Sequence, residues 1–489
     1  MPGDRRSRAR RVAAALLAAV LTVSACSADQ NEASDGSAGG DTPTDGEPRQ
    51  EMTDTELATQ TYVAGYPLVV SVRTLQRLGG LVGVNRLFWQ NALAGPQSRT
   101  IVAPNRDTLY SIAVLDLRAE PMVLTLPEVT ERYFTYQFLD AWTESFAYVG
   151  TRATGGRAGT WVITPPGWDG ELPAGADRIE ATTPQVFLLG RFLVEDEGDI
   201  PNVTAISQQT SLKPLSALTG DPAAPSPPPL GEPVGTAQDI PADAAFFDEL
   251  GDALAVNPPT TAAQRELFAR AEALGIGPGQ HPTGGAADVG GESDRPDVVD
   301  VLDKGAAAGH EQILEAATTV GQTANGWSAN LNIGRYGDDT RLRAAVARVG
   351  WGANIAAEAV YPVARVDAEG HPLDGSATYR ITFPAGELPP VDAFWSLSVY
   401  GDDMFFAEHP SGRYTIGDRT PGLTFGDDGS LEIVLSHDEP PAVADGRAVN
   451  WLPVPAGRFV LMLRLYLPGR TVLDGDYAYP PVRRNDAAG

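Results

Sequence analysis

The sequence predicts a mainly β protein in which two β sections flank a helical section. Short segments rich in β-branched and aromatic residues, separated by Pro and Gly turns, run from residue 100 to 194. Helix signals occupy residues 261–361, and alternating apolar residues return after Pro362. The chain has 489 residues, of which 43 % are hydrophobic, so it is long enough for two domains with buried cores.

The first 25 residues have the anatomy of a signal peptide. Five arginines precede an apolar run from Val12 to Val23, and small residues follow it. The segment Val23-Ser24-Ala25-Cys26 resembles the lipobox of bacterial lipoproteins, which implies that Cys26 is lipidated. A plain secretory signal followed by an incidental cysteine is the alternative. We therefore expect an exported protein anchored to the outer face of the cell membrane through its N-terminal lipid.

Composition limits the partners of the rest of the chain. Residues 26–52 contain hardly any large apolar side chains, which predicts a disordered tether. The chain has 36 basic and 63 acidic residues, a net charge of −27, and such a surface repels nucleic acids and anionic lipid headgroups. Cys26 is the single cysteine, so an intramolecular disulfide is impossible.

Residues 53–215 are expected to form an N-terminal β-sandwich domain with a leading helix. The helix is predicted from Thr53 to Leu78, closed by Gly79-Gly80. After this helix we predict strands that are separated by turns rich in Pro, Gly and Asn: 100–102, 111–116, 122–126, 133–139, 161–164 and 185–194.

Residues 216–362 are expected to be a Pro-rich connection followed by helices. Thr261 and Gln264 form a capping box that starts one helix, and further helices are predicted over 296–320 and 339–361. Residues 363–489 are expected to form a C-terminal β-sandwich domain, because apolar residues alternate over 379–383, 395–399, 431–435 and 459–465.

The two β sections echo each other in sequence. Residues 132–140 resemble residues 393–402, and residues 184–194 resemble residues 457–467, with Arg191 and Arg464 at the same place in the second pair. An ancestral duplication would produce this pattern. The alternative is convergence, since any two half-buried strands share alternation.

Familiar catalytic motifs are absent from the sequence. The chain has two lysines, and its five histidines never fall at spacings of three or four residues. We therefore expect no cofactor and no metal site, and no nucleophile with an adjacent base is visible. Whether the protein is an enzyme stays open at this point.

Polar turns at strand ends are the candidate site. Asn105, Arg106 and Asp107 precede the strand that carries Tyr110, and Asp140 and Trp142 end another strand. The second β section supplies a matching loop with alternating charge, which contains Arg413, Tyr414, Asp418 and Arg419. Asp107 and Asp140 are the candidate catalytic carboxylates, and the other residues are candidate ligand contacts. The structural alternative is an internal ion pair of Arg106 with Asp107 or Asp140, with Trp142 in the core.

The same stretches carry a family resemblance. Residues 62–69, 104–111 and 139–142 resemble the bacterial domain of unknown function 1254, and residues 383–397, 413–423 and 450–453 resemble its partner, domain 1214. The resemblance implies exported proteins with two β-sandwich domains of jelly-roll type joined by helices, an architecture similar to the amidase peptide N-glycosidase F. It implies no established activity.

Two kinds of function follow as hypotheses. In the first, a cleft between the sandwiches binds a glycan or another small polar ligand, and hydrolysis by paired carboxylates, as in an amidase or glycosidase, is the catalytic alternative. A glycosidase would need the two carboxyl groups roughly 5 to 9.5 Å apart. In the second, the protein is a non-enzymatic envelope scaffold with an exposed apolar patch, and self-association is left open.

Overall fold

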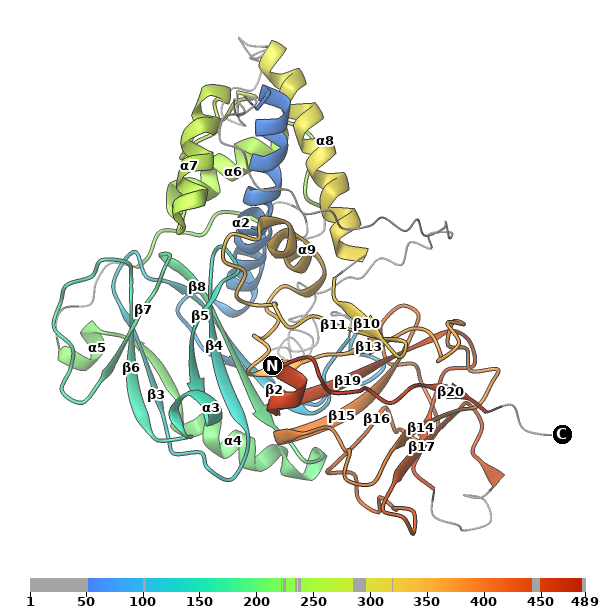
Figure 1. Cartoon of the computed structure of the whole chain (residues 1–489). Coiled ribbons are helices and arrows are strands. Elements are labelled where there is room, and N and C mark those ends of the chain that lie inside the picture. The colour runs from blue at the N-terminus through green and yellow to red at the C-terminus, as the bar shows by residue number, and fades with distance from the viewer. Residues whose placement is uncertain are drawn as a thin grey trace, which may run out of the picture.

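The computed structural model describes residues 52–99, 103–220, 222, 226–233, 235, 239–284, 296–318, 320–441 and 449–485. The predicted signal peptide, Cys26, nearly all of the tether and the predicted strand 100–102 lie outside these residues. Figure 1 shows a helical body standing above two lobes built from sheets. The prediction of a mainly β protein with helices is confirmed. In the described ranges no helix has both the length and the apolar character required to span a bilayer.

The first lobe contains two sheets that share a core. Sheet 1 has the strand order β1 (Phe88–Trp89), β2 (Thr108–Asp116), β8 (Gln185–Leu193), β4 (Phe134–Asp140), β5 (Ser145–Gly150). Sheet 2 has the order β7 (Asp177–Glu180), β6 (Gly159–Thr164), β3 (Met122–Leu126), β9 (Ser211–Pro214). Leu109, Phe134 and Leu188 from sheet 1 pack with Leu124 and Ile163 from sheet 2.

The second lobe repeats this arrangement. Sheet 3 has the order β10 (Gln322–Ala324), β11 (Trp327–Ala329), β13 (Val363–Ala364), β19 (Phe459–Pro468), β15 (Val391–Gly401), β16 (Thr415–Gly417), and β12 (Ala359–Val360) also pairs with β19. Sheet 4 has the order β18 (Trp451–Pro453), β17 (Leu431–Ser436), β14 (Tyr379–Phe383), β20 (Arg483–Arg484). Trp395, Leu397 and Leu463 of sheet 3 share a core with Ile381 and Ile433 of sheet 4.

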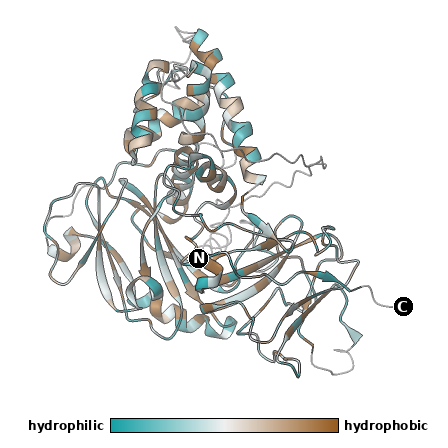
Figure 2. Ribbon diagram, in the orientation of Figure 1, coloured by the Kyte–Doolittle hydropathy of each residue, from teal (hydrophilic) through white to brown (hydrophobic). Residues whose placement is uncertain are grey.

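The helical body is organised around the leading helix. It contains α2 (Asp54–Val82), α6 (Ala245–Val256), α7 (Ala262–Ala271), α8 (Pro296–Thr318) and α9 (Thr340–Gly350). Hydrophobic and hydrophilic residues alternate along these helices (Figure 2), and the hydrophobic ones form one cluster that also covers Val114 and Phe187 of sheet 1. The leading helix therefore packs both with the later helices and on the first lobe. Shorter helices lie elsewhere: α3 (Thr151–Thr154), α4 (Ile200–Gln209), α5 (Ser216–Thr219) and α11 (Arg470–Leu473).

Capping residues in the sequence predicted where helices begin more accurately than glycines predicted where they end. Thr53 with Glu56, and Thr261 with Gln264, form the capping boxes of α2 and α7. Helix α2 does not end at Gly79 as predicted but continues to Val82, and Gly83 with φ 85° is its C-cap. Gly79 instead allows close packing, since a Cβ atom there would come within 2.8 Å of the Leu230 side chain. The helix predicted over 339–361 ends at Gly350, and β12 occupies 359–360.

The echo between the β sections has a structural counterpart. Thr135 of β4 lies opposite Arg191 of β8, and Ser396 of β15 lies opposite Arg464 of β19.

Candidate functional site

Sheets 1 and 3 meet through a layer of polar and aromatic side chains. Alternation along each strand sends one face to the apolar core of its lobe and the other toward the opposite lobe. We call the meeting residues the polar layer, which comprises Tyr110, Tyr133, Thr135, Gln137 and Arg191 from sheet 1 and Phe394, Ser396, Ser398, Arg464 and Tyr466 from sheet 3. Contacts join the two sides directly, because the ring centroid of Tyr133 lies 5.7 Å from that of Phe394 and 5.2 Å from that of Tyr466.

The predicted turn at Asn105 and Asp107 meets the predicted loop at Arg419 at one end of the polar layer. The Asp107 carboxylate accepts hydrogen bonds from Ser396 Oγ at 2.6 Å and from Arg419 Nη2 at 2.8 Å. The Asn105 side chain donates to the Tyr466 hydroxyl at 2.8 Å. The ion pair between Asp107 and Arg419 joins the two lobes. Asp107 is only 4 % exposed, so its carboxylate has little access to solvent.

Asp418 lies beside this ion pair. Its carboxylate accepts a hydrogen bond from Trp395 N at 3.2 Å, and its Oδ1 lies 3.5 Å from Arg419 Nε. Burial raises the pKa of Asp418, and the positive charge of Arg419 opposes that shift. Arg419 also donates to the Val194 carbonyl and lies 4.4 Å from the Phe394 ring centroid. The predicted Asp418 and Arg419 thus belong to the fastening of the lobes.

Arg106 has a different partner from those expected. It donates to the Ala94 carbonyl at 2.7 Å and to Glu197 Oε1 at 2.9 Å, so neither Asp107 nor Asp140 is its counter-charge. Tyr414 does approach this turn, with its ring centroid 5.8 Å from the Arg106 guanidinium carbon. Arg413 points to sheet 4, where it donates to the Trp451 carbonyl at 2.7 Å.

Asp140 lies far from Asp107. Asp107 bonds through its backbone with Val194, whereas Asp140 lies opposite Val186, eight residues away along the same stretch of chain. At about 3.3 Å per residue the two acids are about 26 Å apart, which does not suit a pair of catalytic carboxylates. Asp140 is 2 % exposed and accepts hydrogen bonds from Trp142 N, Glu144 N and Thr182 Oγ1. Burial raises its pKa to about 6.

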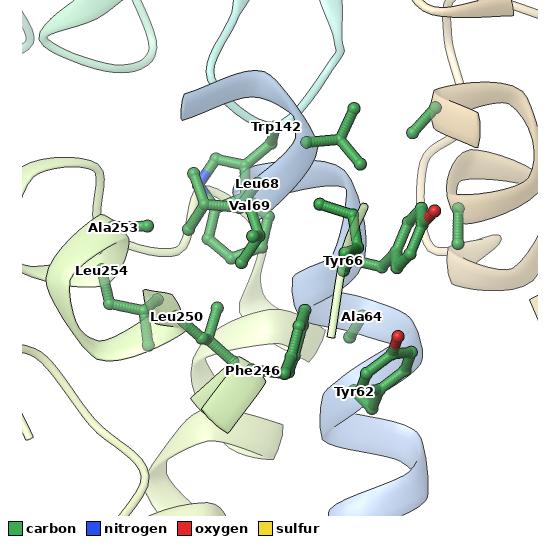
Figure 3. Packing of buried hydrophobic residues seen from close by; sticks show 14 of the residues in the cluster. Tyr62, Ala64, Tyr66, Leu68, Val69, Trp142, Phe246, Leu250, Ala253 and Leu254 are labelled. Carbon is green, nitrogen blue, oxygen red and sulfur yellow. The ribbon is translucent and has the colours of Figure 1, made fainter. Parts of the chain in front are cut away.

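Trp142 belongs to the helical core. Figure 3 shows it beside Leu68 and Val69 of α2, and its ring centroid lies 5.7 Å from that of Phe268. Its Nε1 donates to the Pro258 carbonyl at 3.0 Å, and no part of it is exposed. The indole therefore has the packing role that the sequence left as the alternative to ligand contact.

A second group of residues surrounds Arg191 within the polar layer. We call it the Arg191 cluster, which comprises Arg191, Gln137, Asn354, Tyr110 and Tyr361. Arg191 Nη1 donates to Gln137 Oε1 at 2.9 Å and to Asn354 Oδ1 at 3.0 Å, and Nη2 donates to the Gly352 carbonyl at 2.9 Å. Across the described residues, no carboxylate forms a salt bridge with Arg191, whose three acceptors are all neutral.

Four tyrosines neighbour Arg191. They are Tyr361, Tyr110, Tyr466 and Tyr133. Burial raises the pKa of Tyr361, Tyr133 and Tyr466, so their hydroxyls stay neutral near pH 7. Tyr110 and Tyr361 are half-buried, whereas Gln137, Arg191 and Asn354 are buried.

Sequence reasoning named Tyr110 but missed the centre of this cluster. The signal that could have found it was the echo, which placed Arg191 and Arg464 at matching positions inside otherwise apolar strands. A charged residue in an apolar strand needs a polar environment, so its presence predicts one. Tyr361 and Asn354 carried no such signal, because they lie in an irregular segment that only the folded chain brings to sheet 1.

A hollow of about 340 Å³ lies elsewhere, between α2, α7, α8 and the start of α9. Its lining includes Val63, Leu267, Arg270 and Arg341, and it contains none of the predicted site residues. Arg341 is paired with Glu315 there. Within the described ranges, no group of three or more acidic, histidine or cysteine side chains is arranged to hold a metal ion.

Comparison with solved structures shows the same fold in another bacterial protein. The VPA0106 protein from Vibrio parahaemolyticus aligns with a TM-score of 0.69 and 23 % identity, covering 89 % of this chain and all of that one. An uncharacterized protein from Burkholderia cenocepacia aligns at a TM-score of 0.42 and 12 % identity, covering 88 % of this chain and 94 % of that one. No curated protein matches the sequence.

Two family models match the chain, in the predicted order. Residues 84–214 match the model described as "Protein of unknown function (DUF1254)", and residues 358–470 match "Protein of unknown function (DUF1214)". The first match spans most of the strands of sheets 1 and 2, and the second includes β15 and β19. The chain therefore carries a DUF1254 domain followed by a DUF1214 domain.

Proposed function

We propose that this protein is an exported envelope lipoprotein that binds a small polar ligand, such as a glycan, between its two sheet pairs. The N-terminal signal and Cys26 support export and attachment to the membrane through the lipid alone. The net charge of −27 argues against a nucleic-acid partner. We further propose that each pair of sheets is a sandwich of jelly-roll type.

The observation that carries the binding proposal is the chemistry of the Arg191 cluster. A guanidinium, two side-chain amides and two tyrosines gather where two lobes meet, and the tyrosines keep part of their surface exposed. Binding sites commonly lie between domains and combine aromatic walls with a few fixed polar groups. The cluster therefore offers a ligand both stacking surfaces and directed hydrogen bonds.

The hydrolase alternative fits the geometry less well. Asp107 accepts hydrogen bonds from Ser396 and Arg419. Asp140, which lies about 26 Å from Asp107, accepts hydrogen bonds from three other donors. A paired-carboxylate mechanism needs both acids beside one scissile bond. We therefore place binding ahead of catalysis.

The scaffold alternative has one observation for it and one against it. Arg106 is held in an internal pair with Glu197, as that alternative expects. The large hydrophobic residues that are exposed in the described ranges are spread over the molecule and form no single patch: Leu81, Leu218, Leu314, Phe425 and Leu473. A docking surface would need them together.

Export and anchoring can be tested by fractionating bacterial cells that express the full chain. We expect the protein in the membrane fraction with an acylated N-terminal Cys26, and we expect a Cys26→Ser variant to lose acylation and leave that fraction. Native mass spectrometry of the gently purified protein then tests binding through retained small-molecule mass. Recovery of Cys26 without acyl groups would refute the anchoring, and a ligand-free body that binds no sugar or small acid would refute the binding role.

A further inference from the structure

The donors of Arg191 are only partly used by the protein. The guanidinium has five N–H groups, and three of them are bonded, two on Nη1 and one on Nη2. The Nε–H group and the second Nη2–H group are left. A carboxylate can grip the Nε and Nη2 side of a guanidinium with two parallel hydrogen bonds.

This edge is not sealed by the fold. In the described residues, the buried side-chain polar atoms without a partner are Thr143 Oγ1, Arg343 Nε and Arg419 Nε. Arg191 Nε has no partner either, yet it is not one of these buried atoms, and Arg191 as a whole retains 5 % exposure. Tyr110 and Tyr361 are the two members of the Arg191 cluster that are not fully buried, so a ligand would have to approach from their side.

The surrounding tyrosines add unused donors. The hydroxyl of Tyr466 accepts from Asn105, and the hydroxyl of Tyr361 accepts from Asn354 at 3.0 Å, so each keeps its own proton to donate. No hydrogen bond joins the Tyr110 hydroxyl to any described residue. An excess of donors around an arginine favours a ligand that supplies acceptors and negative charge.

We propose that the ligand held between the two sheet pairs presents a carboxylate to the free edge of Arg191 and to the hydroxyls of Tyr110 and Tyr361. The inference rests on the proposed binding function and names the chemical class of its ligand. Its physical reason is charge. A buried cation that has only neutral partners is costly, and a carboxylate would supply both the missing charge and the missing acceptors.

Two other buried arginines have an internal carboxylate partner, whereas Arg464 has neutral hydrogen-bond acceptors and Asp107 nearby. Arg73 pairs with Glu249, and Arg343, which is 2 % exposed, pairs with Glu144 at 2.8 Å. Both have an internal carboxylate, whereas Arg191 has none. This contrast also supplies a control, because Arg343→Lys changes a buried arginine that is already paired and lies outside the Arg191 cluster.

The test uses pairs of probes that differ only in charge. Glucuronate is compared with glucose, and acetate with acetamide, by isothermal titration calorimetry and thermal shift on the mature chain in low-salt buffer. We expect at least one acid to bind ten times or more tightly than its neutral counterpart. Arg191→Lys, which keeps the charge but loses the two-pronged edge, should weaken that acid tenfold or more, Tyr110→Phe about threefold, and Arg343→Lys not at all.

The outcomes separate the two proposals. Equal binding of acid and neutral probes, or unchanged acid binding by a folded Arg191→Lys variant, would overturn the carboxylate assignment and leave the binding function standing. If Arg191→Lys fails to fold, the Tyr110→Phe variant and the charge-matched probes decide in its place. Absence of binding for every probe, together with no retained ligand in native mass spectrometry, would overturn both proposals.

Discussion

Arg191 and Arg464 occupy matching places in the two lobes, yet their surroundings differ. Each lies on a central strand opposite a small hydroxyl residue, and each donates to a side chain two residues further along the neighbouring strand, Gln137 or Ser398. Arg464 also donates to the Tyr400 hydroxyl and to the carbonyls of residues 103 and 104, and Asp107 is among its main electrostatic neighbours. Arg191 has no acid in that role.

The difference separates an arginine that has an acid among its neighbours from one that has only neutral neighbours, and our binding proposal rests on the second. The turn that precedes β2 covers Arg464 and brings Asp107 close to it. The protein itself therefore supplies Arg464 with hydrogen-bond acceptors and a nearby negative charge. The groups around Arg191 are the neutral amides of Gln137 and Asn354, the Gly352 carbonyl and tyrosines. The matching positions agree with the duplication that the sequence suggested, and the two copies differ in whether an acid lies near the arginine.

The largest expected effect comes from replacing Arg464, whose hydrogen bonds join β19 to the turn before β2. Arg464→Met should lower the free energy of unfolding by about 3 to 5 kcal/mol, because it leaves two buried carbonyls and two buried hydroxyls without their donor and removes a positive charge near Asp107. Arg191→Met should cost only about 1 to 2 kcal/mol, because the loss of three neutral hydrogen bonds is offset by removing an unpaired buried charge. Guanidinium denaturation followed by tryptophan fluorescence measures both, and equal losses would break the comparison.

Asp107→Asn makes the surroundings of Arg464 resemble those of Arg191. The amide keeps an acceptor for Ser396 but loses the ion pair with Arg419, whose side chain is 21 % exposed. We expect a loss of about 2 to 3 kcal/mol in unfolding free energy near pH 7. Asp107→Glu, which keeps the charge at a different reach, is the matched variant. A stable Asp107→Asn protein would show that Asp107 is not the counter-charge of this side.

Asp140 is a buried acid without a salt-bridge partner among the described residues; three hydrogen bonds and the nearby charge of Arg343 support its ionised form. Its folded-state pKa is raised to about 6, above the ordinary value of about 3.9, so the folded chain holds the proton more tightly. Its contribution to stability is therefore present below about pH 4 and is lost as the pH rises to about 6. Asp140→Asn should remove this loss and gain about 3 kcal/mol above pH 7 relative to pH 4.

Thermal melts of both proteins from pH 4 to pH 8 measure this difference. Parallel stability curves would contradict it, because they would mean that Asp140 titrates at the same pH in the folded and unfolded chains. Glu144→Gln controls for the nearby carboxylate that pairs with Arg343.

Replacing Arg106 should have the smallest effect on the free energy of unfolding. It pairs with Glu197, whose side chain is 73 % exposed, so water already screens this charge pair. Arg106→Gln should change the unfolding free energy by less than about 1 kcal/mol, and raising the salt concentration should shrink the effect further. A loss as large as that of Asp107→Asn would place Arg106 among the residues that fasten the lobes. Denaturation at two salt concentrations measures it.

Local rules in the sequence determined the parts of the fold that depend on neighbouring residues. Capping boxes at Thr53 and Thr261 started their helices, and alternation marked β14, β15, β17 and β19. The family motifs placed the two domains in their order, and the turn at Asn105 and the loop at Arg419 were expected to share one end of the lobes, where they do meet.

Tertiary structure alone decided which polar residues act together. Asp107 and Asp140 looked like a pair in the sequence, but strand length separates them along sheet 1. Arg106 found Glu197 and Trp142 entered the helical core, because the loops that carry their partners come from distant parts of the chain. Arg191 stood out as a charge in an apolar strand, but its lack of a carboxylate follows from contacts with residues 352–361, which no local pattern encodes.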